Sequence, residues 1–165
     1  MIPIPRTALD VQLSARLAVL TSRLASASAD AAAARTAWQS ARSERGRLRS
    51  RLIEMAPGNR RCMYCGDSLG TDIDHFQPIA KNVARTFDWL NHLLACSHCN
   101  SNEKRDQFPF DSDGNPLLID PTRDDPDRHL LLLLSSGEYR ALSPMGAASI
   151  EVYGLNRTDL VMGRS

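Results

Sequence analysis

The fold is decided by residues 62–104, which read CMYCGDSLGTDIDHFQPIAKNVARTFDWLNHLLACSHCNSNEK. All four cysteines of the chain lie in this stretch as two pairs, each with two residues between its members. Such spacing lets both thiolates of a pair face one point, and two pairs complete a tetrahedron around zinc. Four protein ligands close the shell, so the ion would be structural. The predicted zinc ligands are Cys62, Cys65, Cys96 and Cys99.

Two other uses of paired cysteines are disfavoured. Disulfides are rare in chains that are not exported, and the N-terminus lacks the basic-then-apolar pattern of a secretion signal. A thioredoxin-like redox motif is disfavoured because there are two pairs and no strand–helix–strand pattern around them. The missing signal also predicts a cytoplasmic protein, although a nucleus would fit the same pattern.

Residues 71–78 (TDIDHFQP) predict a short strand that ends at proline. Within it, Asp74 offers an oxygen ligand for a divalent ion, and His75 offers a base that titrates near neutrality. Neighbouring strand residues point to opposite faces, so both side chains reach one phosphate only if the strand ends or twists at this pair. An Asp–His pair by itself more often has a structural role.

The remainder of the stretch predicts a second strand and a helix. Residues 89–95 (WLNHLLA) run directly into the second cysteine pair, and residues 99–106 have the pattern of a polar helix. Asn100 and Lys104 lie one turn apart on the same face of that helix. Strand, strand and helix therefore carry His75, Asn91 and Asn100 in that order around one zinc. We expect a small α+β core.

This order of motifs resembles the zinc-bound HNH (ββα-metal) endonuclease family. The family's pattern is CxxC, then Asp or Glu followed by His-x-x-Pro, then Asn, then CxxC followed by His or Asn, with a lysine beyond. Asn100 stands where other members have His, a substitution that the family tolerates. The matching elements are Cys62 and Cys65, Asp74 and His75 with Pro78, Asn91, Cys96 and Cys99 with Asn100, and Lys104.

The resemblance implies hydrolysis of phosphodiester bonds in nucleic acid, with DNA as the favoured substrate. It implies that His75 is the general base and that Asp74 and Asn100 hold one catalytic Mg²⁺ or Mn²⁺. Asn91 would orient His75 through local hydrogen bonds and would not touch the ion. Lys104 would contact phosphate.

Arginine side chains could add phosphate contacts. The resemblance implies that Arg105 assists the lysine, and Arg60 and Arg61 lie directly before the first cysteine pair. The alternative is a solvated helix face without a ligand. Seven arginines between residues 42 and 61 precede the core, and together their guanidinium groups could hold several phosphates. The cluster, opposed only by Glu44 and Glu54, consists of Arg42, Arg45, Arg47, Arg49, Arg51, Arg60 and Arg61.

The N-terminal third has the pattern of a helix. Residues 8–56 contain no proline, and their only glycine is Gly46. Apolar positions recur in steps of four and three from Leu13 to Met55, a heptad pattern over six repeats that is broken at Arg45. We expect one helix roughly 70 Å long, whose apolar stripe pairs with a helix of a second copy or of another protein. The alternative, a hairpin bent at residues 28–33, is disfavoured because no Gly, Pro or Asn marks a turn there.

These patterns divide the chain into a helix for oligomer or partner docking (residues 1–56), a nuclease core (57–110) and a C-terminal extension (111–165). Pro57-Gly58-Asn59 marks the first boundary as a turn. Beyond Pro109 the chain is acidic and interrupted by prolines, with short apolar segments at 117–119 and 130–134. A strand or turn is expected at 148–155, and a helix capped by Thr158 has barely begun when the sequence stops. We expect an irregular extension that is cut short.

Composition sets broad limits. The chain has 165 residues, of which 42% are apolar and 24% charged, as in a soluble globular domain. The formal net charge of +1 neither favours nor excludes nucleic acid as a partner. No segment approaches the roughly 18 apolar residues of a membrane span. We therefore expect no membrane partner.

A looser resemblance extends beyond the core. The downstream motifs are similar to those of HNH subunits from ATPase-partnered anti-phage systems of the Septu and retron type. This resemblance implies an ATPase partner, for which the N-terminal helix would be one docking surface. The motifs are Trp89-x-Asn91-x-Leu93-Leu94, Phe108-Pro109, Leu117 with Asp120-Pro121, Asp124-Asp125-Pro126 and Gly154-Leu155-Asn156-Arg157.

Two other functions compete with phosphodiester cleavage. The first is a catalytically silent zinc module that binds nucleic acid through its arginines. Such a module has no need of Asp74, His75 and Asn100, whose joint presence favours the enzyme. The second is a coiled-coil adaptor, which accounts for residues 8–56 and leaves the centre unexplained.

Overall fold

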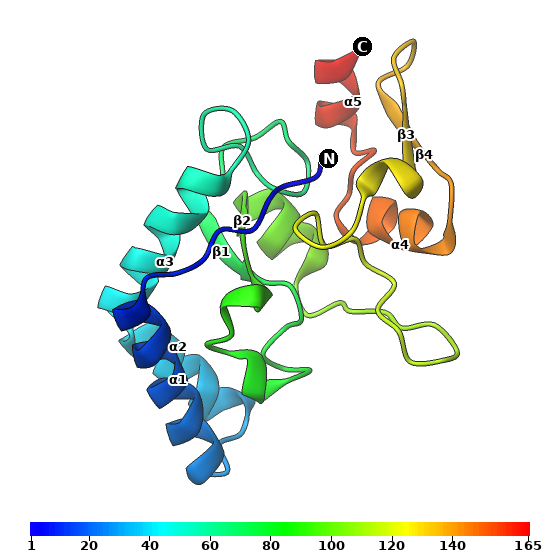
Figure 1. Ribbon diagram of the computed structural model, residues 1–165. Coiled ribbons are helices and arrows are strands. Elements are labelled where there is room, and N and C mark those ends of the chain that lie inside the picture. Colours follow the sequence, from blue (N-terminus) through cyan, green and yellow to red (C-terminus); the bar gives the residue numbers. More distant parts are fainter.

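The computed structural model describes residues 1–165, and its first third is folded as three helices. They are α1 (Val11–Ser26), α2 (Ala31–Ser40) and α3 (Arg42–Met55) (Figure 1). The single long helix expected for residues 8–56 is therefore wrong, and the hairpin is correct. Ser28 adopts a left-handed conformation (φ 48°), and the Asp30 carboxylate accepts a hydrogen bond from the Ala33 N–H at the start of α2. The left-handed Ser28 reverses the chain and the acidic N-cap starts the next helix, so the turn needs no Gly, Pro or Asn.

Most of the heptad stripe is buried within the chain itself. Its side chains pack against Ile79 and Phe87, which lie between the two central strands, so no partner helix is needed to cover them. The docking role expected for this stripe, in a homo-oligomer or with an ATPase, is wrong because its side chains form part of the core. The stripe residues in this cluster are Leu13, Leu17, Leu24, Ala34, Trp38, Ala41 and Leu48.

The centre of the molecule is a two-stranded antiparallel sheet. Strand β1 (Asp72–His75) pairs with β2 (His92–Ala95), so that Asp74 lies opposite Leu93 and His75 opposite His92. One 3₁₀ turn (Val83–Arg85) lies in the loop between the strands, and a second (Trp89–Asn91) leads into β2. A short π-helix, η3 (His98–Lys104), follows β2. The expected order of strand, strand and helix is confirmed.

The C-terminal third completes the main core. It contains a hairpin of β3 (Leu130–Leu133) and β4 (Glu138–Ala141), then α4 (Pro144–Val152) and α5 (Thr158–Arg164), with a 3₁₀ turn (Pro126–Arg128) before the hairpin. The strand or turn expected at 148–155 is mostly helix, and this region is not an irregular extension. Its core residues, in one buried cluster with β2 and the cysteines, are Leu118, Ile119, Leu130, Val152, Tyr153, Leu155 and Leu160.

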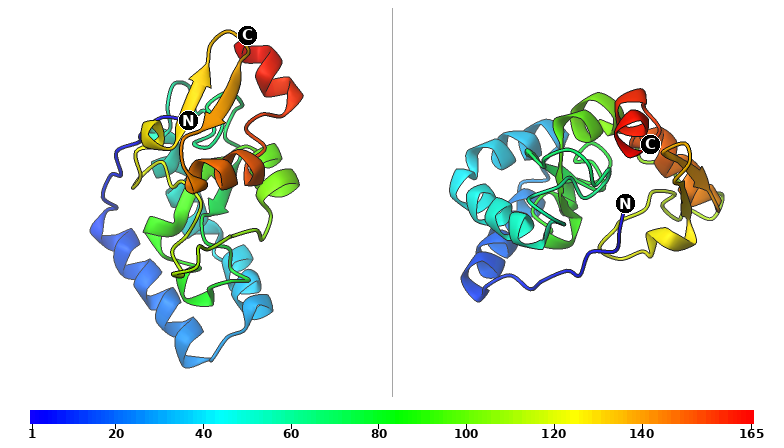
Figure 2. Two further views of the ribbon diagram at one scale, coloured as in Figure 1. Left: turned by 90° about the vertical axis from the view of Figure 1, so that its right-hand side faces the viewer. Right: turned by 90° about the horizontal axis from the view of Figure 1, so that it is seen from above.

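The sheet lies between the N-terminal helices and the C-terminal elements (Figure 1, Figure 2). Ile73 and Trp89 pack against the buried clusters on both sides, which joins the two halves. The first residues run in extended form past the sheet, where the Ile4 N–H donates to the Pro121 carbonyl at 2.8 Å. Residues 1–56 are therefore packed against the rest of the chain as part of one structure.

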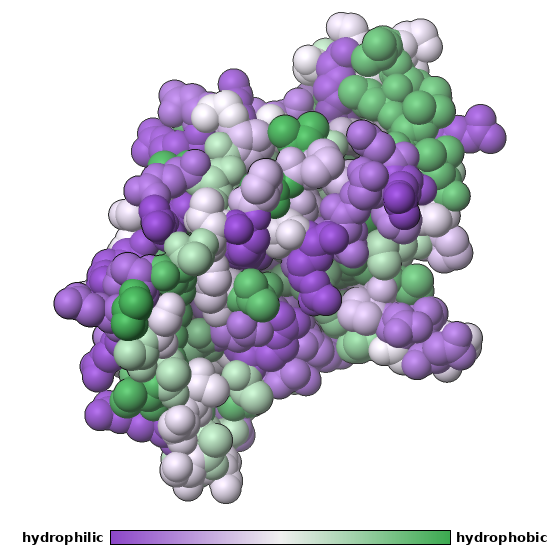
Figure 3. Space-filling model, viewed as in Figure 1, coloured by the Kyte–Doolittle hydropathy of each residue, from purple (hydrophilic) through white to green (hydrophobic).

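The surface of the molecule is mixed in polarity. Figure 3 shows apolar side chains gathered over the β3–β4 hairpin and smaller apolar areas over α1, with polar residues between them. No helix is both long enough and apolar enough to cross a lipid bilayer. The exposed apolar side chains of this C-terminal region are Leu131, Leu134, Leu142 and Met162.

Candidate functional site

The four cysteines converge on one point. Their sulfur atoms lie within 4.8 Å of one another, all four residues are buried, and none forms a disulfide. A tetrahedral zinc with Zn–S bonds of about 2.3 Å would hold sulfurs about 3.8 Å apart, so the cluster fits the ion. The predicted ligand set of Cys62, Cys65, Cys96 and Cys99 is positioned for a zinc site.

The cysteine pairs are fixed to the end of the central sheet. The N–H of Met63, inside the first pair, donates to the Leu94 carbonyl of β2 at 2.8 Å. Cys96 follows β2 directly, and Cys99 lies in η3. The Arg157 guanidinium approaches the Cys99 sulfur at 3.4 Å, where its charge would offset that of a zinc–thiolate centre. A metal at this point would therefore fix η3 relative to the sheet.

One cavity brings together the three residues expected to act on phosphate. It has a volume of about 170 Å³, and Asp74, His75 and Asn100 line it. Strand β1 ends at His75, which satisfies the condition under which neighbouring strand residues reach one site. Asp74 and His75 are buried, at 4% and 9% exposure, whereas Asn100 is half-buried.

The hydrogen bonds of His75 determine which ring nitrogen can accept a proton. Its Nε2 lies 3.0 Å from the carbonyl oxygen of Thr86, and a carbonyl oxygen only accepts, so Nε2 carries the hydrogen. The lone pair is then on Nδ1. Burial lowers the pKa of His75 below its ordinary value, which favours the neutral ring. A neutral imidazole with a free Nδ1 lone pair is the form that a general base requires.

A second histidine supports the first. His92 is fully buried, and its Nε2 donates to the same Thr86 carbonyl at 3.1 Å. Burial lowers the pKa of His92 well below its ordinary value. The Trp38 ring of α2 stacks on His92 and meets His75 edge-on, with ring centroids 4.9 and 4.6 Å apart. The N-terminal helices thus pack directly on the candidate base.

Asn91 holds the loop that carries Thr86. Its Oδ1 accepts from the Gln77 N–H at 2.8 Å, and its Nδ2 donates to the carbonyls of Gln77 and Arg85, at 3.0 and 3.1 Å. The side chain is fully buried and does not line the cavity. These bonds tie the end of β1 to the residue before Thr86, and they support the predicted local role of Asn91.

Lys104 is predicted to contact phosphate, but it does not line the cavity. Its ammonium group is fully buried and contacts both carboxylate oxygens of Asp74, at 3.1 and 3.2 Å, and it donates to the His75 carbonyl at 2.8 Å. A buried ammonium needs a counter-charge, which Asp74 provides. The phosphate contact expected for Lys104 is therefore wrong. The hydroxyl of Tyr64, a residue that sequence reasoning missed, also donates to Asp74.

The oxygen atoms of the cavity suit a hard divalent cation. A carboxylate offers about four lone-pair directions, so Asp74 keeps capacity beside Lys104 and Tyr64. The Nδ2 of Asn100 donates to Asp72 at 3.4 Å, which leaves the amide oxygen of Asn100 without a hydrogen-bond partner. Asp72 also escaped sequence reasoning. It lies two positions before Asp74, on the same face of β1, and period-two alternation could have indicated it.

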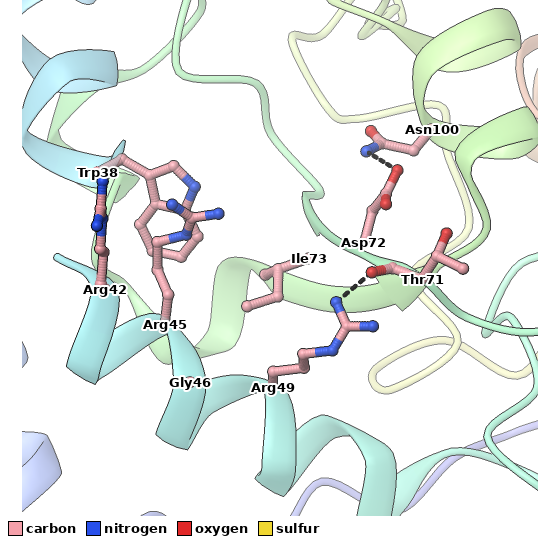
Figure 4. Close-up of a pocket in the computed structure, with 9 residues that line it drawn as sticks. All are labelled: Trp38, Arg42, Arg45, Gly46, Arg49, Thr71, Asp72, Ile73 and Asn100. Carbon is pink, nitrogen blue, oxygen red and sulfur yellow. Dashed lines mark hydrogen bonds between the residues drawn. The ribbon is translucent and has the colours of Figure 1, made fainter. Parts of the chain in front are cut away.

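The predicted basic residues divide into two groups. Arg105 lines the cavity, whereas Arg60 and Arg61 line neither it nor the larger one beside it. The Arg61 guanidinium instead donates to the Asp67 carbonyl. The larger cavity, of about 460 Å³, is lined by arginines of α3 and shares Ile73 and Asn100 with the smaller one (Figure 4). Its arginines are Arg42, Arg45 and Arg49.

Comparison with known proteins agrees with this geometry. Residues 62–106 match the family described as HNH endonuclease. The chain is similar to the Septu protein PtuB of Bacillus mycoides (strain KBAB4), with 29% identity over 138 residues, or 65% of this chain and 46% of the relative. The chain thus spans about half the length of the curated relative it matches. Both resemblances stated from the motifs are confirmed.

Proposed function

We propose, from the HNH endonuclease match over residues 62–106, that this chain is a metal-dependent endonuclease that hydrolyses phosphodiester bonds of nucleic acid. One observation carries the proposal. Asp74 and His75 of β1 line one cavity with Asn100 of η3, which lies 25 residues further along the chain. The four thiols would hold structural zinc, which keeps η3 in place beside β1.

In this proposal His75 removes the proton from the attacking water. Its Nδ1 accepts the proton, and the Thr86 carbonyl keeps the ring oriented and stabilises the imidazolium that forms. Lys104 positions the site by joining Asp74 to the His75 backbone.

Asp74 and Asn100 would hold the Mg²⁺ or Mn²⁺. When bound, such an ion supplies charge stabilisation at the phosphate and at the leaving oxygen. Arg105, on the cavity wall, carries a positive charge that can face the phosphate.

A catalytically silent nucleic-acid-binding module remains the alternative. It would explain the arginines of α3 and the cysteine cluster. It would not explain why a neutral histidine, a carboxylate and an amide oxygen share one small cavity, because binding alone requires none of them. The coiled-coil adaptor fails because the heptad stripe is buried within the chain.

The deciding experiment is a cleavage panel with the zinc-loaded protein. Supercoiled plasmid, linear duplex DNA, single-stranded DNA and single-stranded RNA are incubated with Mg²⁺, with Mn²⁺, or without added divalent ion. We expect nicking that requires the added ion, with DNA as the preferred substrate. Intact substrates in every arm, including arms supplemented with an ATPase encoded beside the gene, would refute the proposal.

We also propose a place for the protein in anti-phage defence, with an ATPase partner, as its similarity to the Septu protein suggests. The partner would bind outside the heptad stripe, since those side chains lie in the core. Mixing the purified protein with the ATPase should give one complex in sedimentation. Two separate species at micromolar concentration would contradict this part of the proposal.

A further inference from the structure

The larger cavity has features that the cleavage mechanism does not use. It lies between α3 and the start of β1 and is lined by Arg42, Arg45 and Arg49. Figure 4 shows the Arg49 guanidinium donating to the Thr71 carbonyl and Arg45 lying against Trp38. We call this space the arginine cavity. Because Asn100 and Ile73 line both cavities, it opens directly beside the candidate metal ligands.

The three guanidinium groups of this cavity have no carboxylate partner. None of them takes part in a salt bridge, whereas Arg47 and Arg51 elsewhere on α3 pair with Asp10 and Glu54, at 2.7 and 2.5 Å. The only acidic residue of the cavity, Asp72, accepts a hydrogen bond from Asn100. The cavity therefore keeps an excess of positive charge.

Arg45 gives the clearest indication of an anion site. Its Nη1 atom donates to the Gln39 carbonyl at 3.3 Å, but its Nε atom is buried and has no hydrogen-bond partner, and the guanidinium lies 5.5 Å from the centre of the Trp38 ring. A buried donor on a charged group is costly when it is unpaired. Arg45 is also the residue that breaks the apolar stripe of the N-terminal helices. An anion in the cavity would explain both features.

The spacing of the arginines fits a sugar–phosphate backbone. Positions 42, 45 and 49 differ by three and four residues, so their side chains leave the same face of α3. At 1.5 Å per residue they span about 10 Å. One strand of a nucleic acid places a phosphate about every 3.4 Å along the helix axis, so about three phosphates would fit this length.

We infer that the arginine cavity binds the phosphates that flank the cleaved bond, so that α3 guides one strand into the cavity of His75. The inference rests on the proposed nuclease function, because it takes the neighbouring cavity to hold the cleaved phosphate. It assigns the N-terminal helices a role in substrate binding in place of the partner docking predicted from their heptads.

The test compares two double variants of the same helix. Arg42→Gln/Arg49→Gln removes two charges from the cavity, and Arg47→Gln/Arg51→Gln removes two charges outside it. Binding of the zinc-loaded proteins to fluorescent duplex DNA and to single-stranded DNA and RNA is measured by anisotropy, without Mg²⁺ or Mn²⁺, between 50 and 200 mM salt. Zinc content and melting temperature show that each variant is folded.

We expect the cavity variant to lose about 1.8 units from the slope of log K against log salt on a duplex, or about 1.4 units on a single strand. In 0.1 M salt this corresponds to roughly 60-fold weaker duplex binding, since each lost phosphate contact costs about eightfold. The control variant should keep the wild-type slope. The nucleic acid whose slope changes identifies the form that the cavity binds.

Equal slopes for the wild type and the cavity variant would overturn the inference, as would an equal loss in the control variant. Failure of the nuclease proposal looks different. In that case the wild type cuts no substrate, while the difference in slope between the two variants remains.

Discussion

Replacement of His75 by alanine is expected to lower metal-dependent cleavage by about 10²–10⁴-fold, the usual contribution of a positioned general base. The side chain is held by the Thr86 carbonyl with Nδ1 free, and no other histidine lines the cavity. Zinc content should not change, because none of the four cysteines contacts this ring through a hydrogen bond. The initial rate of plasmid nicking in Mg²⁺ or Mn²⁺ measures the effect.

The matched control is His98→Ala. His98 is half-buried in the second cysteine pair, and its Nε2 lies 3.2 Å from the Glu103 carboxylate. With four thiols available it is not needed as a zinc ligand. The control should therefore cleave at close to the wild-type rate. If the His75 variant cleaves as fast as the wild type, the base has been misidentified.

Replacement of Cys96 by serine is expected to unfold the core. Zinc binding in small domains contributes about 10–16 kcal/mol, which is comparable to the whole net stability of about 5–15 kcal/mol of a typical folded protein. The cysteine cluster joins β2 to η3, so loss of one of its four ligands should release the ion. Asn100, which lies in η3, would then no longer be held in place. Zinc content by mass spectrometry and thermal unfolding by circular dichroism measure the outcome.

Ser97→Ala is the control for this substitution. Ser97 lies next to Cys96 in the same turn, is exposed and provides no side-chain cap for η3. It should bind zinc fully and melt like the wild type. A Cys96 variant that loses zinc but still melts cooperatively near the wild-type temperature would show that the metal is not what holds the core together.

The core could be predicted from the sequence because its chemistry is local. The two cysteines of each pair, and the Asp–His pair before a proline, are close along the chain, so their spacing alone restricts their geometry. The order of strand, strand and helix follows from the same stretch. The spacing does not reveal the hydrogen bonds of the site. Only the structure shows that the Thr86 carbonyl accepts a hydrogen bond from both His75 and His92.

The N-terminal helices show where a periodic pattern stops being informative. A heptad pattern shows that one face of a helix is buried, but it does not say against what. Here Phe87 and Ile79 of the same chain cover that face. The turn depends on a left-handed Ser28 and an Asp30 cap, and the cap before a run of alanines was the signal that could have indicated it.

Lys104 and the C-terminal third depend on tertiary packing. A lysine on a polar helix looks exposed in sequence, and only the fold reveals that its ammonium is enclosed with Asp74. Likewise, residues 111–165 contain short strands and prolines, which resemble an irregular extension until Ile119 and Tyr153 are seen in the core. Neither burial could be derived from periodicity.

The most direct test of the central claim is a Mn²⁺ titration of the zinc-loaded protein, followed by the electron paramagnetic resonance of free Mn²⁺. The claim is that Asp74 and Asn100 form one divalent-cation site beside His75. We expect the wild type to bind one Mn²⁺ per chain, and the Asn100→Ala variant to bind it at least about tenfold more weakly. The control is Asn102→Ala, which changes an exposed residue of the same helix and should bind Mn²⁺ with wild-type affinity. No bound Mn²⁺, or equal affinity in all three proteins, would contradict the account.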